Sequence, residues 1–200
     1  RSTLFPYTTL FRSIVRGRYD EKELNETYIG NVRRYELIYK YYCKYGSRQA
    51  LGFCCSREHA REMAKEFSKR GIPSVAVFSD ASGEYTEDRN VAIRQLKQGK
   101  IRVIFSVDMF NEGVDITSVD MFLRPTESPI VFLQQLGRGL RKCRGKEFLI
   151  VLDFIGNYEK AGRVRFLLSD RSNQHAGAYN PSDTSAFPDD CLVDFDMKLI

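Results

Sequence analysis

Short, largely apolar runs separated by longer amphipathic segments dominate the middle of the chain. Each run holds five or six residues, a length typical of a strand that is buried in a parallel sheet. The runs lie at 50–55, 74–78, 101–105, 119–123 and 148–152. Strands that alternate with helices at this spacing predict βαβ crossovers. We therefore expect an α/β fold in which helices cover both faces of a parallel sheet.

Capping residues mark the helices that connect these strands. Ser56 can accept a hydrogen bond at the start of a helix over 57–69, and Thr86 can do the same for a second helix. A third helix is expected from Pro129, because proline suits the first helical position and the preceding Ser128 is a good N-cap.

The segments on either side of this region have different patterns. Residues 14–46 predict a helical lead-in of two helices, over 20–27 and 31–45, whose tyrosines form a packing face rather than a base-stacking platform. Residues 169–190 are rich in Ser, Asn, Asp, Gly and Pro and predict a flexible loop. Residues 191–200 turn apolar again, and we interpret them as the start of a further element that is cut short.

The first thirteen residues follow neither a helical nor a strand period, and they contain Thr-Leu-Phe twice. Residues 3–13 resemble the in-frame translation of a sequencing-adapter oligonucleotide. We interpret 1–13 as an artefact outside the fold, with a short β-hairpin as the alternative. On this interpretation the chain is a fragment, and its gene extends upstream.

Composition adds few constraints. The formal charge of +5 permits an anionic partner such as nucleic acid without requiring one. The five cysteines are odd in number and none has a metal-ligand spacing, so we expect no metal site and a reducing, cytoplasmic environment. No apolar run is long enough to span a bilayer. His59 and His175 have no partner at ligand spacing, and we expect both on the surface.

A pair of arginines distinguishes the last predicted helix. Arg138 and Arg141 are three residues apart and share one face with Gln134. Their guanidinium groups offer donor forks that suit phosphate oxygens. Gly137 and Gly139 each cost a helix roughly 1 kcal/mol relative to Ala, which indicates that a ligand approaches the backbone closely. The alternative is a solvated basic helix end, which the helix dipole also favours.

Three segments follow strands of the predicted sheet, and parallel sheets bind ligands at the carboxyl ends of their strands. These segments are the turn after Cys55, VIFSVDMFNEGVDI and QQLGRGLRK, the last of which has the pattern Q-x-x-G-R-x-x-R. Their order and separation resemble motifs IV, V and VI of superfamily 2 helicases. Residues 47–168 thus resemble the second RecA-like domain of these enzymes. LRPTESP and VLDFIGNY are similar to the bacterial DEAD/DEAH-box group related to type III restriction-enzyme helicase subunits.

The resemblance implies roles for five nucleotide-site residues. Arg138 and Arg141 match the arginine fingers, which would reach across a cleft to the γ-phosphate of ATP and act in catalysis. Gln134, Gly113 and Asp115 match motif positions near the nucleotide.

Nucleic-acid contacts are implied at other positions. Ser106 matches a motif V hydroxyl that contacts the nucleic-acid backbone, although an ordinary serine at a strand end is the alternative. The helix starts at Ser56 and Thr86 are expected to add backbone contacts, which need no base code and are salt-sensitive. We interpret the nearby Arg57 and Arg89 as surface charges.

Two elements that such motors need are absent from the sequence. It contains neither G-x-x-x-x-G-K-[ST] nor a DEAD-like acidic box. In this family both belong to the first motor domain, which would hold most of the ATP and its Mg²⁺. We expect an ATP-dependent DNA helicase or translocase whose partners are that missing domain and DNA. DNA rather than RNA is implied by the subgroup alone. The chain by itself should bind ATP weakly and hydrolyse none.

Two other function classes are the alternatives. A non-enzymatic nucleic-acid-binding α/β module would not need the arginine pair. A small-molecule Rossmann enzyme is disfavoured, because no G-x-G-x-x-G follows the first predicted strand.

Overall fold

The computed structural model describes residues 14–15, 18–19, 29–80, 82–107, 110, 117–124, 141 and 143–153. The chain divides into two compact units, and all described residues fall in the unit Leu10–Phe154. Predictions for 1–13, for the helix over 20–27, for the helix from Pro129 and for 169–200 lie outside the described residues.

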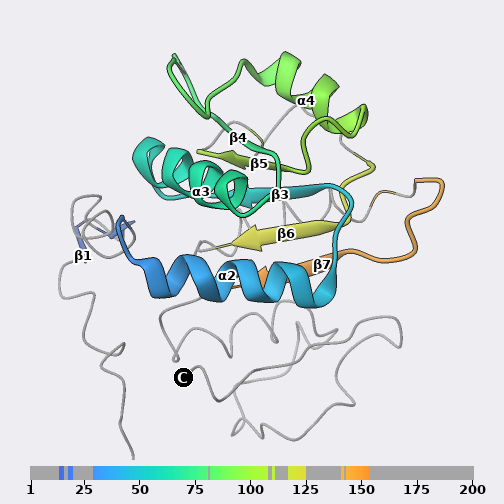
Figure 1. The fold of residues 1–200 in the computed structure, drawn as a ribbon, viewed down its shortest axis with the longest axis horizontal. Coiled ribbons are helices and arrows are strands. Elements are labelled where there is room, and N and C mark those ends of the chain that lie inside the picture. Colours follow the sequence, from blue (N-terminus) through green and yellow to red (C-terminus); the bar gives the residue numbers. More distant parts are fainter. Residues whose placement is uncertain are drawn as a thin grey trace, which may run out of the picture. The chain divides into compact units, whose positions relative to one another are not determined.

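Five parallel strands form one sheet in the order β4-β5-β3-β6-β7 (Figure 1). Their bounds are Ala50–Phe53 for β3, Ser74–Val77 for β4, Val103–Ser106 for β5, Met121–Arg124 for β6 and Ile150–Asp153 for β7. Each predicted strand is present, with ends displaced by at most two residues. The predicted α/β fold with a parallel sheet is confirmed.

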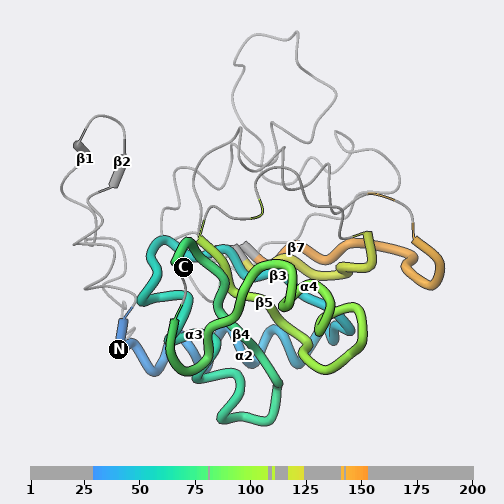
Figure 2. The backbone as a smooth tube through the Cα atoms, turned by 90° about the horizontal axis from the view of Figure 1, so that it is seen from above, coloured from blue at the N-terminus to red at the C-terminus, as the bar shows by residue number. Residues whose placement is uncertain are grey.

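Helices cover both faces of this sheet. The helices α2 (Val32–Tyr45) and α3 (Arg57–Lys69) pack on one face, and α4 (Arg89–Lys97) packs on the other. Figure 2 shows the coloured elements α2 to β7 from above. Alternate residues of β5 divide between the two faces, since Val103 and Phe105 belong to the core cluster that includes α2 and α3, while Ile104 belongs to the cluster on the α4 side. This division follows from the strand period of two residues.

An aromatic cluster joins α2, α3 and the sheet. The fully buried ring of Phe67 lies 5.4 Å from that of Tyr42 and 5.0 Å from that of Phe105, both in edge-on geometry. Edge-to-face pairs of this kind each add about 1 kcal/mol beyond the burial of their area. The predicted packing face of tyrosines on α2 is therefore confirmed for Tyr35 and Tyr42, whereas Val32 is exposed.

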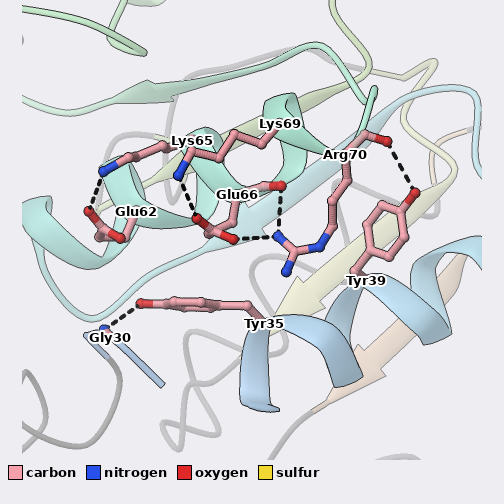
Figure 3. Close-up of polar contacts among 8 residues, drawn as sticks. All are labelled: Gly30, Tyr35, Tyr39, Glu62, Lys65, Glu66, Lys69 and Arg70. Atoms are coloured by element: carbon pink, nitrogen blue, oxygen red, sulfur yellow. Dashed lines mark hydrogen bonds and ion pairs between the residues drawn. The ribbon is translucent and has the colours of Figure 1, made fainter. Parts of the chain in front are cut away.

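Polar contacts add to this helix pair (Figure 3). The hydroxyl of Tyr39 on α2 donates to the carbonyl oxygen of Arg70 at the end of α3, at 3.2 Å. The Arg70 guanidinium in turn donates to the Glu66 carboxylate at 2.5 Å and to the Glu66 carbonyl at 2.9 Å. The hydrogen bond from Arg70 lowers the pKa of Glu66. These contacts position the C-terminal end of α3 on α2.

The predicted cap of α3 is confirmed, whereas that of α4 is wrong. Ser56 accepts a hydrogen bond from the backbone amide of His59 at 3.1 Å. At α4 the cap is Asp88, whose carboxylate accepts from the amides of Asn90 and Val91. Thr86 lies outside the helix, because Asp88 is nearer the helical segment and its charged carboxylate is the stronger acceptor.

The lead-in contains strands that the pattern did not predict. Ile14–Val15 (β1) and Arg18–Tyr19 (β2) pair antiparallel, across a two-residue connection whose second residue is Gly17. Such a connection is typical of a β-hairpin. The helix predicted over 31–45 is present as α2, with Asn31 as its cap. In the part of the chain that the structure describes, no helix has the length and apolar character needed to cross a membrane.

Substitution of Gly52 in β3 tests how closely the side chains of the sheet pack. A Cβ at this position would overlap the ring of Phe105 in the neighbouring strand β5. We expect Gly52→Ala to lower the free energy of unfolding by about 2 kcal/mol, measured by urea denaturation, because a packed core does not accept the extra methyl group. In the background of Phe105→Leu the same substitution should cost less than half as much. An equal cost in both backgrounds would contradict the overlap.

Candidate functional site

Ser106 lies at the carboxyl end of β5, where the resemblance placed a nucleic-acid contact. In the parallel register it is level with Phe53 of β3 and Val77 of β4. Its carbonyl accepts from the amide of Cys54 at 2.8 Å. Its side chain is fully buried, and the hydroxyl has no hydrogen-bond partner among the described residues. A buried hydroxyl without a partner costs about 1–3 kcal/mol, so this hydroxyl is a site of unused hydrogen-bonding capacity.

Ser56, at the start of α3, lies two residues after Cys54, whose amide donates to the Ser106 carbonyl, but the Ser56 hydroxyl is already engaged. It is buried and accepts from the amide of His59. The groups that a phosphate could reach at this helix start are therefore the first-turn backbone amides, which lack intrahelical acceptors. Ser56 would support such a contact by holding the helix start in place.

Thr86 does not occupy the position that the prediction required. Its hydroxyl donates to the carbonyl of Gly83 at 2.6 Å, and Asp88 provides the cap of α4. A carboxylate at a helix start competes with an incoming phosphate for the same amides and repels it. The structural reason for expecting a backbone contact at Thr86 is therefore lost.

Two arginines of α3 were given little weight by the sequence pattern. Arg57 and Arg61 are exposed, and their guanidinium carbons lie 5.8 Å and 5.6 Å from the centroid of the Phe78 ring. Phe78 is buried directly after β4, at the carboxyl edge of the sheet. Stacking on one ring places both cations together beside the start of α3. The spacing of four residues on a helix is the sequence signal that pairs them.

His59 is buried, so its predicted surface position is wrong. It lies four residues before Met63 and eight before Phe67, on the inward face of α3. Its Nδ1 atom is 3.3 Å from the sulfur of Cys55. Burial, followed by the charge of Arg34, lowers the pKa of His59 to about 3. The imidazole is therefore neutral at physiological pH and belongs to the core.

Arg141 lies at the opposite edge of the sheet from Ser106. Its carbonyl accepts from the Lys146 amine at 3.4 Å, and the same amine donates to the carbonyl of Thr117 at 2.9 Å. Thr117 precedes β6, and Figures 1 and 2 both show the orange segment before β7 to one side, where β6 begins. The carbonyl of Arg141 therefore lies near the approach to β6, and the role expected of its side chain stays a prediction. A βαβ crossover must return the chain to the amino edge before the next strand, and β7 begins only at Ile150.

The amino edge is braced by a single carboxylate. Asp120, just before β6, accepts from the Ser47 hydroxyl at 2.6 Å and from the amides of Arg48 and Gln49 at 3.1 Å and 3.3 Å. These bonds join the approach to β3 with the approach to β6. The side chain of Arg141 is exposed beside this braced region.

Four predicted nucleotide-site residues lie outside the described residues. They are Gly113, Asp115, Gln134 and Arg138. Their roles stay predictions. The structure thus places Ser56 and Ser106 at the carboxyl edge and Arg141 at the amino edge.

Comparison with known families agrees with this architecture. The sequence profile of the helicase conserved C-terminal domain matches residues 33–143, more than half of the chain. The chain belongs to this family. The matched region includes α2, four of the five strands of the sheet, and Arg141.

Relatives with this domain include helicases named for DNA and for RNA. IRC3 of Saccharomyces cerevisiae is 32% identical over 111 residues, which are 54% of this chain and 16% of IRC3. The ATP-dependent DNA helicase mph1 of Sclerotinia sclerotiorum is 33% identical over 53% of this chain and 9% of mph1. The ATP-dependent RNA helicase eIF4A of S. cerevisiae is 24% identical over 70% of this chain and 34% of eIF4A. The matched part of the chain thus spans between 9% and 34% of these relatives.

Solved structures of DEAD-box proteins share the fold. The C-terminal domain of Dbp5 has a TM-score of 0.54 at 14% identity, covering 68% of this chain and 77% of that domain. Escherichia coli SrmB, solved bound to RraA, has a TM-score of 0.53 at 21% identity, covering 66% of this chain and 77% of that one. The sheet of this helicase domain is therefore RecA-like.

Burial of His59 predicts a loss of stability in mild acid. The unfolded histidine takes up a proton as the pH falls below about 6.5, whereas the folded one does so only near pH 3. We expect the free energy of unfolding to fall by roughly 2 kcal/mol between pH 6.5 and pH 5, measured by urea denaturation at each pH. His59→Gln, which is neutral throughout, should flatten this slope. A parent protein with equal stability at both pH values would contradict the assignment.

Proposed function

We propose that this helicase domain is the second motor domain of an ATP-dependent DNA helicase or translocase. The observation that carries the proposal is the motif Q-x-x-G-R-x-x-R, which follows the motif V segment within a chain that belongs to the helicase C-terminal family. The last arginine of this motif, Arg141, is exposed.

The arginines act on the nucleotide. Charge accumulates on the γ-phosphoryl oxygens during phosphoryl transfer, and a guanidinium placed against them is worth about 10³–10⁵ in rate in other nucleotide hydrolases. Arg138 and Arg141 fill this role, while Gln134, Gly113 and Asp115 order the nucleotide. ATP and Mg²⁺ are held mainly by a first motor domain, since the sequence has no phosphate-binding loop of its own.

The nucleic acid is bound at the carboxyl edge of the sheet. Ser106, the first-turn amides of α3 and the exposed pair Arg57 and Arg61 supply neutral and cationic donors there. Such contacts recognise the phosphate backbone rather than the bases. ATP can close and open the cleft between two domains while each domain holds the strand.

We expect both finger substitutions to abolish most turnover in the protein that carries both motor domains. Arg138→Ala and Arg141→Ala should each lower kcat for ATP by about 10³-fold, because the transition-state charge loses its partner. Steady-state phosphate release measures this effect. Arg144→Ala is the matched control, since Arg144 is an exposed arginine three residues beyond Arg141 and outside the motif. Unchanged turnover in Arg138→Ala would favour the non-enzymatic binding module.

The identity of the strand is tested by stimulation and by Ser106. We expect single-stranded DNA to stimulate the ATPase more than RNA of the same sequence, and a preference for RNA would overturn the DNA assignment. Ser106→Ala should weaken binding of the DNA about fivefold, measured by fluorescence anisotropy, through loss of one hydrogen bond. The free energy of unfolding should not fall, because the hydroxyl has no partner among the described residues. Ser82→Ala, in an exposed loop, is the control.

A further inference from the structure

We propose that Lys146 is a positioning residue for Arg141, whose backbone it holds close to that of Thr117. The inference rests on the proposed function, because it assigns Lys146 to the same site. It concerns a lysine that lies outside all three helicase motifs and beyond the matched family region.

One amine joins two segments that are distant in the sequence. The Nζ atom of Lys146 donates to the carbonyl oxygen of Thr117 at 2.9 Å and to that of Arg141 at 3.4 Å. Thr117 is the residue directly after the motif V segment, which ends at Ile116. An ammonium carries three donors, and here two of them connect the ends of motifs V and VI.

A tight turn directs the amine back toward Arg141. The Lys146 amide donates to the carbonyl of Cys143 at 3.1 Å, which closes a four-residue turn. Gly145 occupies the third position of this turn with a φ of +79°, a conformation that favours glycine. The chain therefore reverses within the residues that follow Arg141, and the Lys146 side chain lies alongside the segment it has just left.

The turn is also anchored to the rigid base of the sheet. The Arg48 guanidinium donates to the carbonyl of Gly145 at 2.7 Å. The amide of Arg48 donates to the Asp120 carboxylate, which also accepts from Ser47. Lys146 thus holds Arg141 against a part of the fold that is itself braced between β3 and β6.

The surroundings of the amine are those of a partly desolvated ammonium. Burial lowers the pKa of Lys146, while Cys143 and Asp120 raise it. Removal of the amine leaves two carbonyl oxygens short of a donor and frees the backbone of Arg141 to shift. A displacement of about 1 Å at a catalytic group can cost about 100-fold in rate.

The test compares Lys146→Met with Lys146→Arg in the protein that carries both motor domains. Methionine keeps much of the length of the stem but removes the donors, and we expect kcat for ATP to fall by about 10- to 100-fold while the KM for ATP changes less than threefold. Arginine keeps a cationic donor and should restore kcat to within about threefold of the parent. Lys97→Met, an exposed lysine at the end of α4, is the matched control. An unchanged kcat in Lys146→Met would overturn the proposal.

A mutant cycle separates this inference from the proposed function. If Lys146 acts through Arg141, Lys146→Met should cause no further loss of kcat in the background of Arg141→Ala. An equal loss in both backgrounds would show that Lys146 acts independently and would overturn the inference, while Arg141 keeps its role. If Arg141→Ala alone leaves kcat unchanged, the finger assignment itself fails.

Hydrogen exchange supplies a readout that does not depend on turnover. In the nucleotide-free protein, the backbone amides of 141–145 should exchange faster in Lys146→Met than in the parent or in Lys146→Arg. The melting temperature shows whether Lys146→Met has lost its fold. In that case, the exchange rates of Lys146→Arg are compared with those of the parent. Equal exchange in all three proteins would overturn the proposal that Lys146 holds the backbone of Arg141.

Discussion

Parallel pairing of β3 with strands on both sides is the constraint on which the rest of the structure depends. β3 pairs with β5 and with β6, each in parallel register. A parallel pair cannot be joined by a tight hairpin, so each connection must cross a face of the sheet and return. Both faces are therefore covered, and the sheet has two edges with different roles. All strands end at the carboxyl edge, and each connection brings the chain back to the amino edge before the next strand begins.

At the carboxyl edge, close packing of the strands leaves one buried hydroxyl, that of Ser106, without a partner among the described residues. Gly52 permits the Phe105 ring to lie against β3, and Phe105 precedes the buried Ser106. Ser106 itself is fully buried at this end of β5. A hydroxyl held in this way costs free energy in the folded protein, which is common for groups that serve a ligand rather than the fold.

The amino edge is organised by polar bonds rather than by apolar packing. Asp120 joins the approaches to β3 and β6, and Lys146 and Arg48 attach the turn before β7 to that base. Each bond spans residues far apart in the sequence, so it orders a loop that has few apolar contacts of its own. This is the setting in which the backbone of Arg141 lies.

The sequence by itself determined the elements, because buried parallel strands and amphipathic helices have periods that can be counted and Ser56 has a recognisable capping position. It also located Ser106 at the end of a strand, and it marked Arg138 and Arg141 by their spacing. It did not determine the cap of α4, because Thr86 and Asp88 are both good caps and only the backbone path selects one.

Tertiary structure alone decided where the backbone of Arg141 lies and that Lys146 bridges Thr117 and Arg141. A local pattern specifies a residue's neighbours along its own element. The long-range hydrogen bonds that assign it to one side of the sheet arise only when the crossovers have closed.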